Sequence, residues 1–258
     1  MNESINGALI VTLFLIFSSI NAGTIHVAVA SNFTGTAKVL AGRFEEKTGH
    51  NAVLVFGSTG KHYAQIKNGA PFDIFLAADA ARPELLDKEG VAVPGTRFTY
   101  AVGRLVLWSP HERYVDQKGA VLENGEYAFL ALANPKLAPY GEAAKQILQG
   151  RELWKKLGGR LVQGENISQA LQFVKTGNAE LGFVALAQII QFGSPPKGSY
   201  WMIPQSLYHP IEQQAVLLKD TKAARAFLLF IKSDEARSII RSYGYDTPGE
   251  IPKEVKHE

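Results

Sequence analysis

Apolar runs typical of strands alternate with helical patterns along the first part of the chain. Residues 25–30 (IHVAVA) alternate as a strand does, and apolar residues at positions 37, 40, 41 and 44 then recur at the spacing of a buried helix face. A second apolar, β-branched run ends at position 56, and a third covers residues 73–78; each precedes another helical pattern. Strands that alternate with helices in this way predict an α/β fold.

Two long extended runs divide the chain. Residues 100–108 (YAVGRLVLW) and 208–218 (YHPIEQQAVLL) have the pattern of strands that cross between two lobes. The stretch between them repeats the strand-helix alternation, with strands expected at residues 127–131, 161–163 and 181–186. We therefore predict lobe I from residues 23–104 and 209–258, lobe II from residues 105–208, and a hinged cleft between them.

The first 22 residues stand apart from this pattern. Residues 7–20 form an almost unbroken apolar run that is short for a membrane span, and small residues follow at positions 22 and 23. This arrangement predicts a secretory signal peptide at residues 1–22 and a location in the periplasm. Because the segment contains Glu3 and no Lys or Arg, and the bulky Ile20 lies close to the expected cut, a retained N-terminal anchor is the alternative.

Composition narrows the class of function. The 258 residues include no cysteine, which excludes a disulfide framework, a thiolate metal site and a cysteine nucleophile. Loss of residues 1–22 removes one acid, so the formal charge of +3 becomes about +4 in the mature chain. Lys and Arg are spread along the sequence and do not form a stripe, so we expect no binding to nucleic acid. We also expect a monomer.

Two strand ends in lobe I carry hydroxyl residues. Ser58, Thr59 and Gly60 follow one strand and open a helix, where free backbone N–H groups and the helix dipole favour an anion. Ser58 as an ordinary helix N-cap is an equally weighted alternative. Ser31 follows the preceding strand, and it would lie beside Ser58 if the two strands are parallel neighbours.

Two positions in lobe II complete a set of neutral donors. Tyr140 lies between Pro139 and Gly141, which are expected to fix a turn around it, although a buried packing tyrosine is the alternative. Asn166 is expected to cap a helix that begins at Ile167, whose main-chain N–H would face the cleft. Hydroxyls and backbone amides suit a fully deprotonated oxyanion, which accepts every hydrogen bond.

Several stretches resemble the periplasmic molybdate-binding proteins of ABC importers. They are residues 28–33 (AVASNF), 56–61 (FGSTGK), 73–79 (DIFLAAD), 134–141 (NPKLAPYG) and 182–185 (GFVA). The resemblance covers nearly all of the mature chain and implies a type II periplasmic binding protein fold. It also implies molybdate and tungstate as ligands, no cofactor, an ABC transporter permease as partner, and no enzyme activity.

The resemblance assigns the same four site residues. It places the oxyanion against Ser31 and Ser58, with Tyr140 and Ile167 completing the shell. Some members carry a ligand-binding tyrosine where this chain has Ala185, and alanine where it has Tyr140. The phenol is therefore expected on the other side of the pocket, as in a second subgroup of the family.

Other functions fit the sequence less well. A hydrolase that uses Ser58 as its nucleophile would need Gly at position 56, where Phe stands, and a phosphate loop would need Ser or Thr at position 62, where His stands. The six histidines lack ligand spacing, so no direct cation site is expected, and Asp79 is expected to cap a helix. A receptor for sulfate or another tetrahedral oxyanion is the main alternative.

Overall fold

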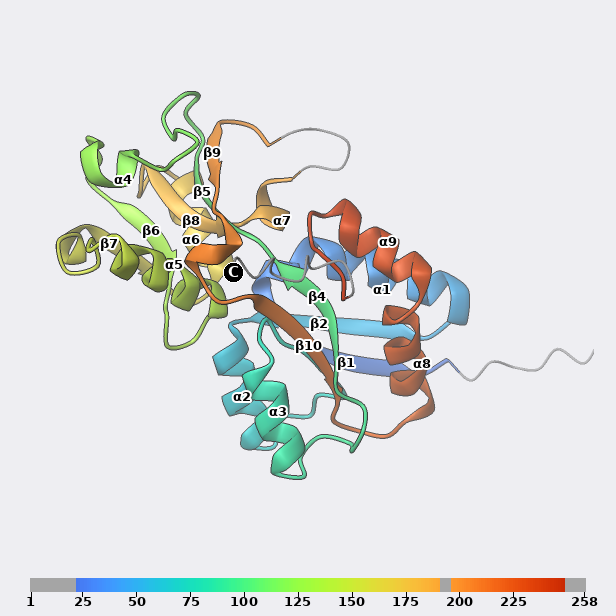
Figure 1. Cartoon of the computed structure of the whole chain (residues 1–258). Helices are drawn as coiled ribbons and strands as arrows, with labels where there is room; N and C mark the ends of the chain where they lie inside the picture. Colours follow the sequence, from blue (N-terminus) through green and yellow to red (C-terminus); the bar gives the residue numbers. More distant parts are fainter. Residues whose placement is uncertain (1–21, 191–195, 249–258) are drawn as a thin grey trace, which may run out of the picture.

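The computed structural model describes residues 22–190 and 196–248, which form two lobes joined by two crossing segments (Figure 1). The expected signal peptide lies outside the described residues, apart from Ala22. Within the described part, no helix has both the length and the apolar character needed to cross a membrane.

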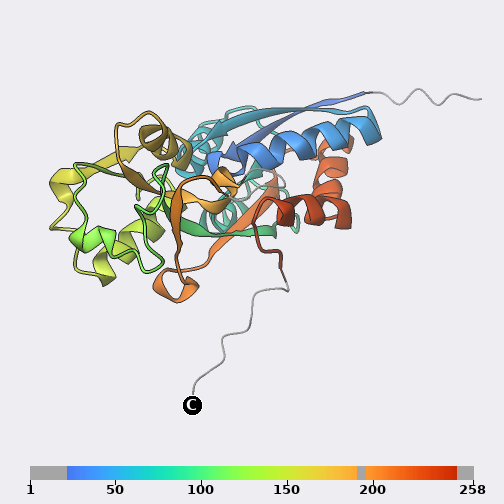
Figure 2. The ribbon, with the colours of Figure 1, turned by 90° about the horizontal axis from the view of Figure 1, so that it is seen from above.

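Lobe I is built on a five-stranded sheet with the order β2-β1-β3-β10-β4. Its strands are β1 (Thr24–Ala30), β2 (Asn51–Gly57), β3 (Ile74–Leu76), β4 (Phe98–Gly103) and β10 (Ile211–Leu217). Its helices are the short η1 (Ser31–Phe33), α1 (Thr34–Thr48), α2 (Thr59–Lys67), α3 (Ala81–Lys88), α8 (Lys222–Ile231) and α9 (Asp234–Ser242). Helices α8 and α9 from the end of the chain pack beside α1, as Figure 2 shows.

Lobe II repeats this topology with the strand order β7-β6-β8-β5-β9. Its strands are β5 (Leu105–Ser109), β6 (Leu130–Ala133), β7 (Leu161–Gly164), β8 (Leu181–Ala185) and β9 (Ser199–Met202). Its helices are α4 (Val121–Asn124), α5 (Pro139–Gly150), α6 (Ile167–Lys175) and α7 (Leu186–Ile189), with the short turns η2 (Gly158–Arg160) and η3 (Gln205–Leu207). Each lobe therefore has three parallel strands whose carboxyl ends lie on the side of the other lobe. In sheets of this kind, ligands bind beyond the carboxyl ends of the strands.

The chain passes between the lobes twice. The run at residues 100–108 is two strands and not one, because β4 ends at Gly103 in the first sheet and β5 begins at Leu105 in the second. The return passes through η3 to β10. Arg104, between β4 and β5, forms a two-bond ion pair with Asp246 at 2.8 and 2.9 Å, which fixes the first crossing to the end of the chain. The exact lobe boundaries given above stay predictions.

One expected strand begins later than the sequence pattern indicates. The prediction of a strand at residues 127–131 is wrong at its start, since β6 covers Leu130–Ala133. The residues before β6 form hydrogen bonds that involve side chains. The Tyr127 hydroxyl donates to the Leu122 carbonyl, and the Phe129 N–H donates to the Glu180 carboxylate. The backbone there is held without a strand partner.

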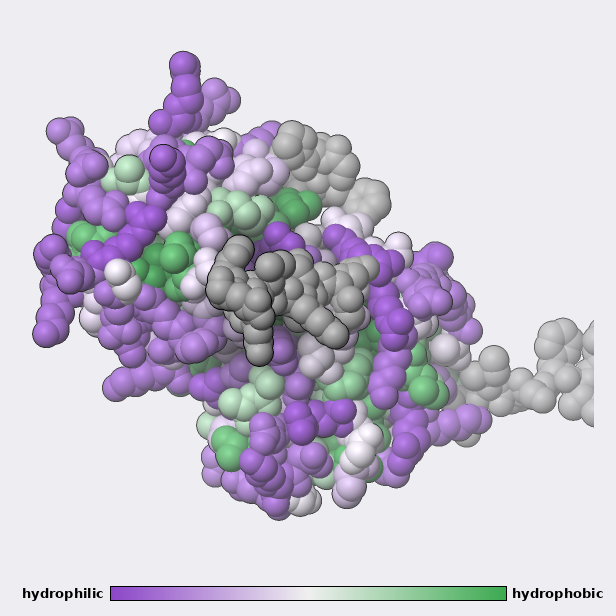
Figure 3. Space-filling model, in the orientation of Figure 1, coloured by the Kyte–Doolittle hydropathy of each residue, from purple (hydrophilic) through white to green (hydrophobic). Residues whose placement is uncertain are grey.

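Each sheet has its own apolar core. In lobe I, Phe44 packs edge-on against Phe227 with ring centroids 5.0 Å apart, and both side chains are fully buried. In lobe II, Phe183 and Ile147 lie in a separate cluster. The face shown in Figure 3 is largely hydrophilic, with small separate apolar areas. The lobe II cluster also includes Ala30, Ala78 and Ile211 of lobe I, so the apolar packing continues across the contact between the lobes.

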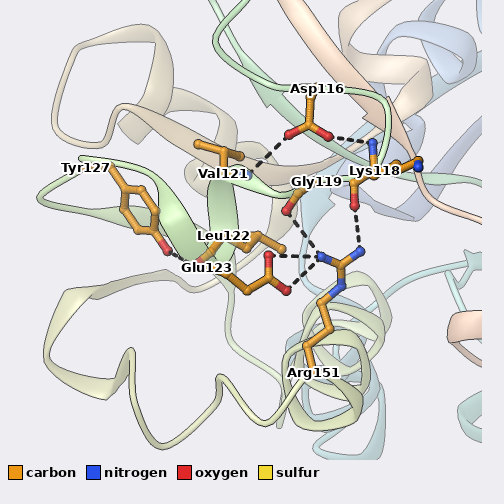
Figure 4. A network of polar contacts seen from close by, with 8 residues as sticks. All are labelled: Asp116, Lys118, Gly119, Val121, Leu122, Glu123, Tyr127 and Arg151. Carbon is orange, nitrogen blue, oxygen red and sulfur yellow. Dashed lines mark hydrogen bonds and ion pairs between the residues drawn. The ribbon is translucent and has the colours of Figure 1, made fainter.

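A polar network fixes the long loop of lobe II that precedes β6 (Figure 4). Arg151, at the end of α5, donates to the carbonyls of Lys118 and Gly119 and to the carboxylate of Glu123. Asp116 accepts two backbone N–H groups at the start of the same loop. All of these contacts join the loop to its own lobe, so the network stabilises lobe II and takes no part in the cleft.

Candidate functional site

Lobe I brings two serines to one edge of its sheet. Strands β1 and β2 pair in parallel with Ala30 opposite Gly57, so the residues that follow them, Ser31 and Ser58, leave the sheet side by side. This confirms the expectation that the two strands are parallel neighbours. Both serines are buried, and both line one small cavity between the lobes.

The structure shows one of the two roles that the sequence left open for Ser58. It is the N-cap of α2, and its Oγ accepts a hydrogen bond from the Lys61 N–H at 3.3 Å. Accepting this bond uses a lone pair and leaves the hydroxyl hydrogen available as a donor. The cap therefore holds the oxygen in place while its hydrogen can point into the cavity.

Ser31 presents its hydroxyl differently. Its carbonyl accepts bonds from the hydroxyls of Thr34, in its own lobe, and of Ser168, in lobe II, at 2.8 and 3.0 Å. Among the described residues, no group forms a hydrogen bond with the Ser31 hydroxyl itself. A buried hydroxyl without a protein partner beside a cavity is suited to a ligand.

Tyr140 lies inside a helix and not in a turn. The expectation of a turn fixed by Pro139 and Gly141 is wrong: Pro139 is the first residue of α5, where a missing N–H is tolerated, and Tyr140 is the second. Gly141 is needed for close packing, because a Cβ there would lie 2.2 Å from the Ala133 carbonyl oxygen. The helix thus begins directly against β6, and this places the phenol in the cleft.

The phenol of Tyr140 has one protein partner among the described residues. Gln213, on β10, donates its Nε2 hydrogen to the phenolic oxygen at 3.2 Å, and the ring is about 1% exposed. Burial raises the pKa of Tyr140 well above its ordinary value, so the group keeps its proton. The phenolic hydrogen has no acceptor in the described protein, and Tyr140 is one of the residues that line the cavity.

The second helix of lobe II contributes a main-chain donor. Asn166 caps α6, as expected, and its side chain accepts the N–H groups of Ser168 and Gln169 at 3.0 and 3.1 Å. The N–H of Ile167, the first residue of the helix, is not used by this cap. It lies at the positive end of the helix dipole and on the cavity wall.

The cavity that these residues share is small and uncharged. Its polar lining residues are Ser31, Asn32, Ser58, Thr59, Tyr140 and Asn166, and the remaining lining consists of Ala, Gly, Pro and Ile. It encloses about 180 Å³ of space free of protein atoms, including its opening to solvent. A space this small suits an ion of a few atoms and not a drug-sized molecule.

Direct contacts hold the two lobes together around the cavity. The Gly60 N–H donates to the Leu137 carbonyl at 2.9 Å, and Lys61 Nζ lies 3.1 Å from the Glu165 carboxylate. A Cβ at Gly60 would lie 3.0 Å from the Leu137 oxygen. The two atoms nearest to that Cβ belong to Leu137 of lobe II. Its glycine is therefore required by the contact between the lobes.

A larger groove opens on the other side of Pro139. The groove encloses about 880 Å³ of space free of protein atoms, including its opening to solvent. Its charged lining residues are Asp79, Arg82, Glu142 and Glu212. Asp79 accepts the Arg82 N–H at 3.0 Å near the start of α3, which confirms its predicted bond to a helix N–H, and it pairs with the Arg82 side chain. Three carboxylates against one guanidinium disfavour an anion there.

The sequence reasoning left Asn32 and Gln213 out of the site, and it named Thr59 beside Ser58 without making it a site residue. Asn32 and Thr59 line the cavity, and the Thr59 hydroxyl accepts the Ala78 N–H at 3.0 Å. Gln213 reaches Tyr140 from a strand 73 positions away. The hydroxyl and amide residues beside Ser31 and Ser58 were visible as polar positions at strand ends, whereas nothing in the sequence pattern indicates Gln213.

Comparison with known proteins gives consistent results. Residues 25–246 match the model of the bacterial extracellular solute-binding protein family. The molybdate-binding protein ModA of Azotobacter vinelandii is 51% identical over 90% of this chain and 93% of its own, and that of Rhodobacter capsulatus is 52% identical over 88% and 89%.

The fold agrees with these sequence matches. The solved structure of the Azotobacter vinelandii periplasmic molybdate-binding protein superposes with a TM-score of 0.85 and 45% identity, and covers 87% of this chain and 99% of its own. The matches extend through both lobes and both crossings. The chain therefore belongs to the bacterial extracellular solute-binding proteins and, within that family, to the ModA proteins.

Proposed function

We propose that this protein captures molybdate in the cavity between its lobes and delivers it to an ABC importer. Tungstate, a dianion of nearly the same size and shape, is proposed as a second ligand. The bound oxygens would be held by the hydroxyls of Ser31, Ser58 and Tyr140 and by the main-chain N–H of Ile167. The ModA relatives, which carry molybdate binding in their names, support this reading over an enzyme function.

The observation that carries the proposal is the chemistry of the cavity wall. Each of the four proposed groups is a neutral donor at a buried position, and no Asp, Glu, Lys, Arg or His of the described chain is among the lining residues. A fully deprotonated oxyanion can accept a bond from each donor. An oxyanion that keeps a proton, such as hydrogen phosphate, has one acceptor fewer for these donors, and a hydroxyl that accepts its proton no longer donates to it, which costs about 1 to 3 kcal/mol.

Helix ends supply the electrostatic part of the site. Three α-helices, α2, α5 and α6, begin at residues that line the cavity or directly beside them. Each directs the positive end of its dipole toward an anion, and at the start of α6 the Ile167 N–H is left free by the Asn166 cap. A dianion can therefore be stabilised without a charged side chain, and a counter-charge need not be buried with it.

Sulfate is the alternative ligand, because it is also a proton-free tetrahedral dianion. It is smaller than molybdate, so the two differ in how well their oxygens reach donors on opposite walls. With donors fixed on both lobes, a smaller ion would satisfy one wall and fall short of the other. The relatives favour molybdate, and sulfate stays the competitor that an experiment must include.

The remaining parts of the proposal concern the setting. We propose that residues 1–22 direct the chain to the periplasm, that the mature protein is a monomer with lobes at residues 23–104, 105–208 and 209–258, and that its partner is a membrane permease. Donors from both lobes would be satisfied together only when the cleft is closed, so closure would signal the loaded state to the permease.

A melting-temperature series tests the proposal. The purified protein is heated with molybdate, tungstate, sulfate or phosphate, and a ligand that binds the native state raises the melting temperature. We expect large increases with molybdate and tungstate and little change with sulfate or phosphate. A larger increase with sulfate would replace the proposed ligand, and no increase with any of the four would overturn the function.

A further inference from the structure

Gln213 lies outside the proposed ligand shell but contacts it through Tyr140. Its side chain is fully buried in the crossing strand β10, and its Nε2 donates to the phenolic oxygen. An amide can point either its nitrogen or its oxygen at a neighbour, and the choice follows from the surrounding hydrogen bonds. The direction of this amide decides whether Tyr140 must accept or donate on that side.

A chain of hydrogen bonds that begins at Tyr245 fixes the orientation of the Gln213 side-chain amide. The Tyr245 hydroxyl donates to the Asn32 main-chain carbonyl at 2.9 Å, which commits its only hydrogen. The same hydroxyl lies 3.1 Å from the side-chain amide of Asn32 and can only accept there, so Asn32 presents Nδ2 to it.

The same Asn32 nitrogen then fixes the next residue. Its second hydrogen is donated to Oε1 of Gln213 at 2.9 Å. The Tyr100 hydroxyl lies 3.1 Å from this oxygen and 3.1 Å from the Ala77 carbonyl, so it is compatible with either orientation of the Gln213 amide. Asn32 is therefore the residue that holds Oε1 away from the cavity and Nε2 toward Tyr140.

From this chain we infer that Gln213 is a positioning residue that makes Tyr140 a donor only, and thereby excludes oxyanions that carry a proton. The inference rests on the proposed function and extends it to the residue behind the shell. With Nε2 donating to its oxygen, the phenol has its hydrogen left for the ligand. A protonated oxyanion would bring a second hydrogen to the phenol, where the accepting side of the oxygen is already occupied by Nε2.

The local backbone is shaped for this contact. The pairing of β10 with β4 shifts register between Gln213 and Gln214, an irregularity that re-aims side chains. On the neighbouring strand β4, where Gly103 pairs with Ile211, a Cβ at Gly103 would lie 2.0 Å from the Tyr140 oxygen and 2.8 Å from Gln213 Nε2. Only glycine at position 103 leaves room for the phenol and the amide to meet.

The test measures ligand discrimination, which a purely structural role would leave unchanged. Gln213→Met keeps the size and neutrality of the side chain and removes its hydrogen bonds. Without Nε2 the phenol can rotate and accept a proton. Dissociation constants are measured by calorimetry for molybdate, and by competition for inorganic phosphate at about pH 8, where the main species is a dianion that keeps one proton.

The neighbouring glutamine provides the matched control. Gln214 lies in the same strand, but its amide bonds to Thr99 and Arg97 and not to the site. Gln214→Met therefore perturbs the same strand without touching Tyr140. The Gln213→Met change is also made in a Tyr140→Phe background, where no phenol remains to be oriented.

We expect Gln213→Met to reduce the preference for molybdate over phosphate by about tenfold or more. The same change should alter the preference by less than about twofold in the Tyr140→Phe background, and Gln214→Met should leave it unchanged. If Gln213→Met does not fold, Tyr245→Phe is measured in its place. This change removes the hydroxyl that orients the Asn32 side chain, so it should also lower the preference for molybdate over phosphate.

Two results would be read differently. A wild-type protein that binds none of the oxyanions defeats the proposed function itself. A wild-type protein that binds molybdate, together with a folded Gln213→Met variant of unchanged preference, overturns the role of Gln213 alone. An equal loss of preference with and without the Tyr140 hydroxyl would also overturn it, since the effect would not pass through the phenol.

Discussion

Replacing Tyr140 by Phe removes one hydroxyl and keeps the ring that packs in the core of lobe II. The hydroxyl has two roles in the account given above: it accepts a bond from Gln213 at 3.2 Å and it is available to donate to the ligand. The sequence left a packing role open as the alternative. The substitution separates the two readings, because ligand affinity depends on the second role and the stability of the ligand-free protein on the first.

The size of the expected effect follows from the kind of bond that is lost. A neutral donor to a charged acceptor contributes about 1.5 to 3 kcal/mol. Because each 1.4 kcal/mol is about tenfold in a dissociation constant, molybdate binding should weaken by between about tenfold and about a hundredfold. The helix ends and the two serines remain, so binding should be weakened and not abolished.

The ligand-free protein should also lose some stability. Gln213 is fully buried, and Tyr140→Phe leaves its Nε2 without an acceptor, which costs about 1 to 3 kcal/mol of unfolding free energy. Tyr127 offers a matched control in the same lobe: it is buried, and its hydroxyl makes one bond, to the Leu122 carbonyl at 3.0 Å (Figure 4). Tyr127→Phe should reduce stability without changing affinity.

Calorimetric titration with molybdate and thermal unfolding without ligand give the two readouts. We expect Tyr140→Phe to weaken binding by at least about tenfold while Tyr127→Phe stays within about twofold of wild type. If the two variants lose similar stability and both keep wild-type affinity, Tyr140 is a core residue. The second lobe would then bind through backbone amides alone.

Three further changes test other parts of the site. Ser58→Ala removes a donor and a helix cap, so calorimetry should show molybdate affinity lower by about 1.5 to 3 kcal/mol; an unchanged dissociation constant with an intact fold would remove Ser58 from the site. Gly60→Ala places a Cβ 3.0 Å from the Leu137 oxygen and should raise the dissociation constant about threefold or more and reduce ligand-induced compaction in solution scattering, whereas Gly42→Ala, with nothing within 4 Å, should do neither. Burial lowers the pKa of His62 below its ordinary value, so below about pH 6.5 the unfolded chain binds more protons than the folded one, and the free energy of unfolding decreases as the pH is lowered. Urea unfolding at several pH values should show a weaker dependence of this free energy on pH for His62→Gln, and an equal slope would contradict this.

The parallel pairing of β1 with β2 and the position of Ser58 were accessible from sequence because they depend on local patterns. An apolar run that ends at small polar residues marks a strand end, and two such ends joined by one helical crossover come together in a parallel sheet, as Ala30 and Gly57 do. The cap at Asn166 follows from local chemistry in the same way. These features need no knowledge of distant contacts.

The reasons behind particular residues were less accessible because they lie in the other lobe or in another strand. Gly141 was expected to fix a turn, yet it is required by the Ala133 carbonyl at the end of β6, and Gly60 is required by the Leu137 carbonyl across the cleft. The start of β6 depends on where the Tyr127 and Glu180 side chains bond. Gln213 is one amide in an ordinary strand pattern, and its role follows only from the residues that tertiary structure brings to it.

The most direct test of the central claim is the position of molybdenum in a crystal grown with molybdate, found from its anomalous scattering. The account predicts one strong peak between the lobes, with ligand oxygens in hydrogen-bond reach of the hydroxyls of Ser31, Ser58 and Tyr140 and of the Ile167 main-chain N–H. A peak in the larger groove beside Arg82, or no ordered peak at saturating molybdate, would contradict it.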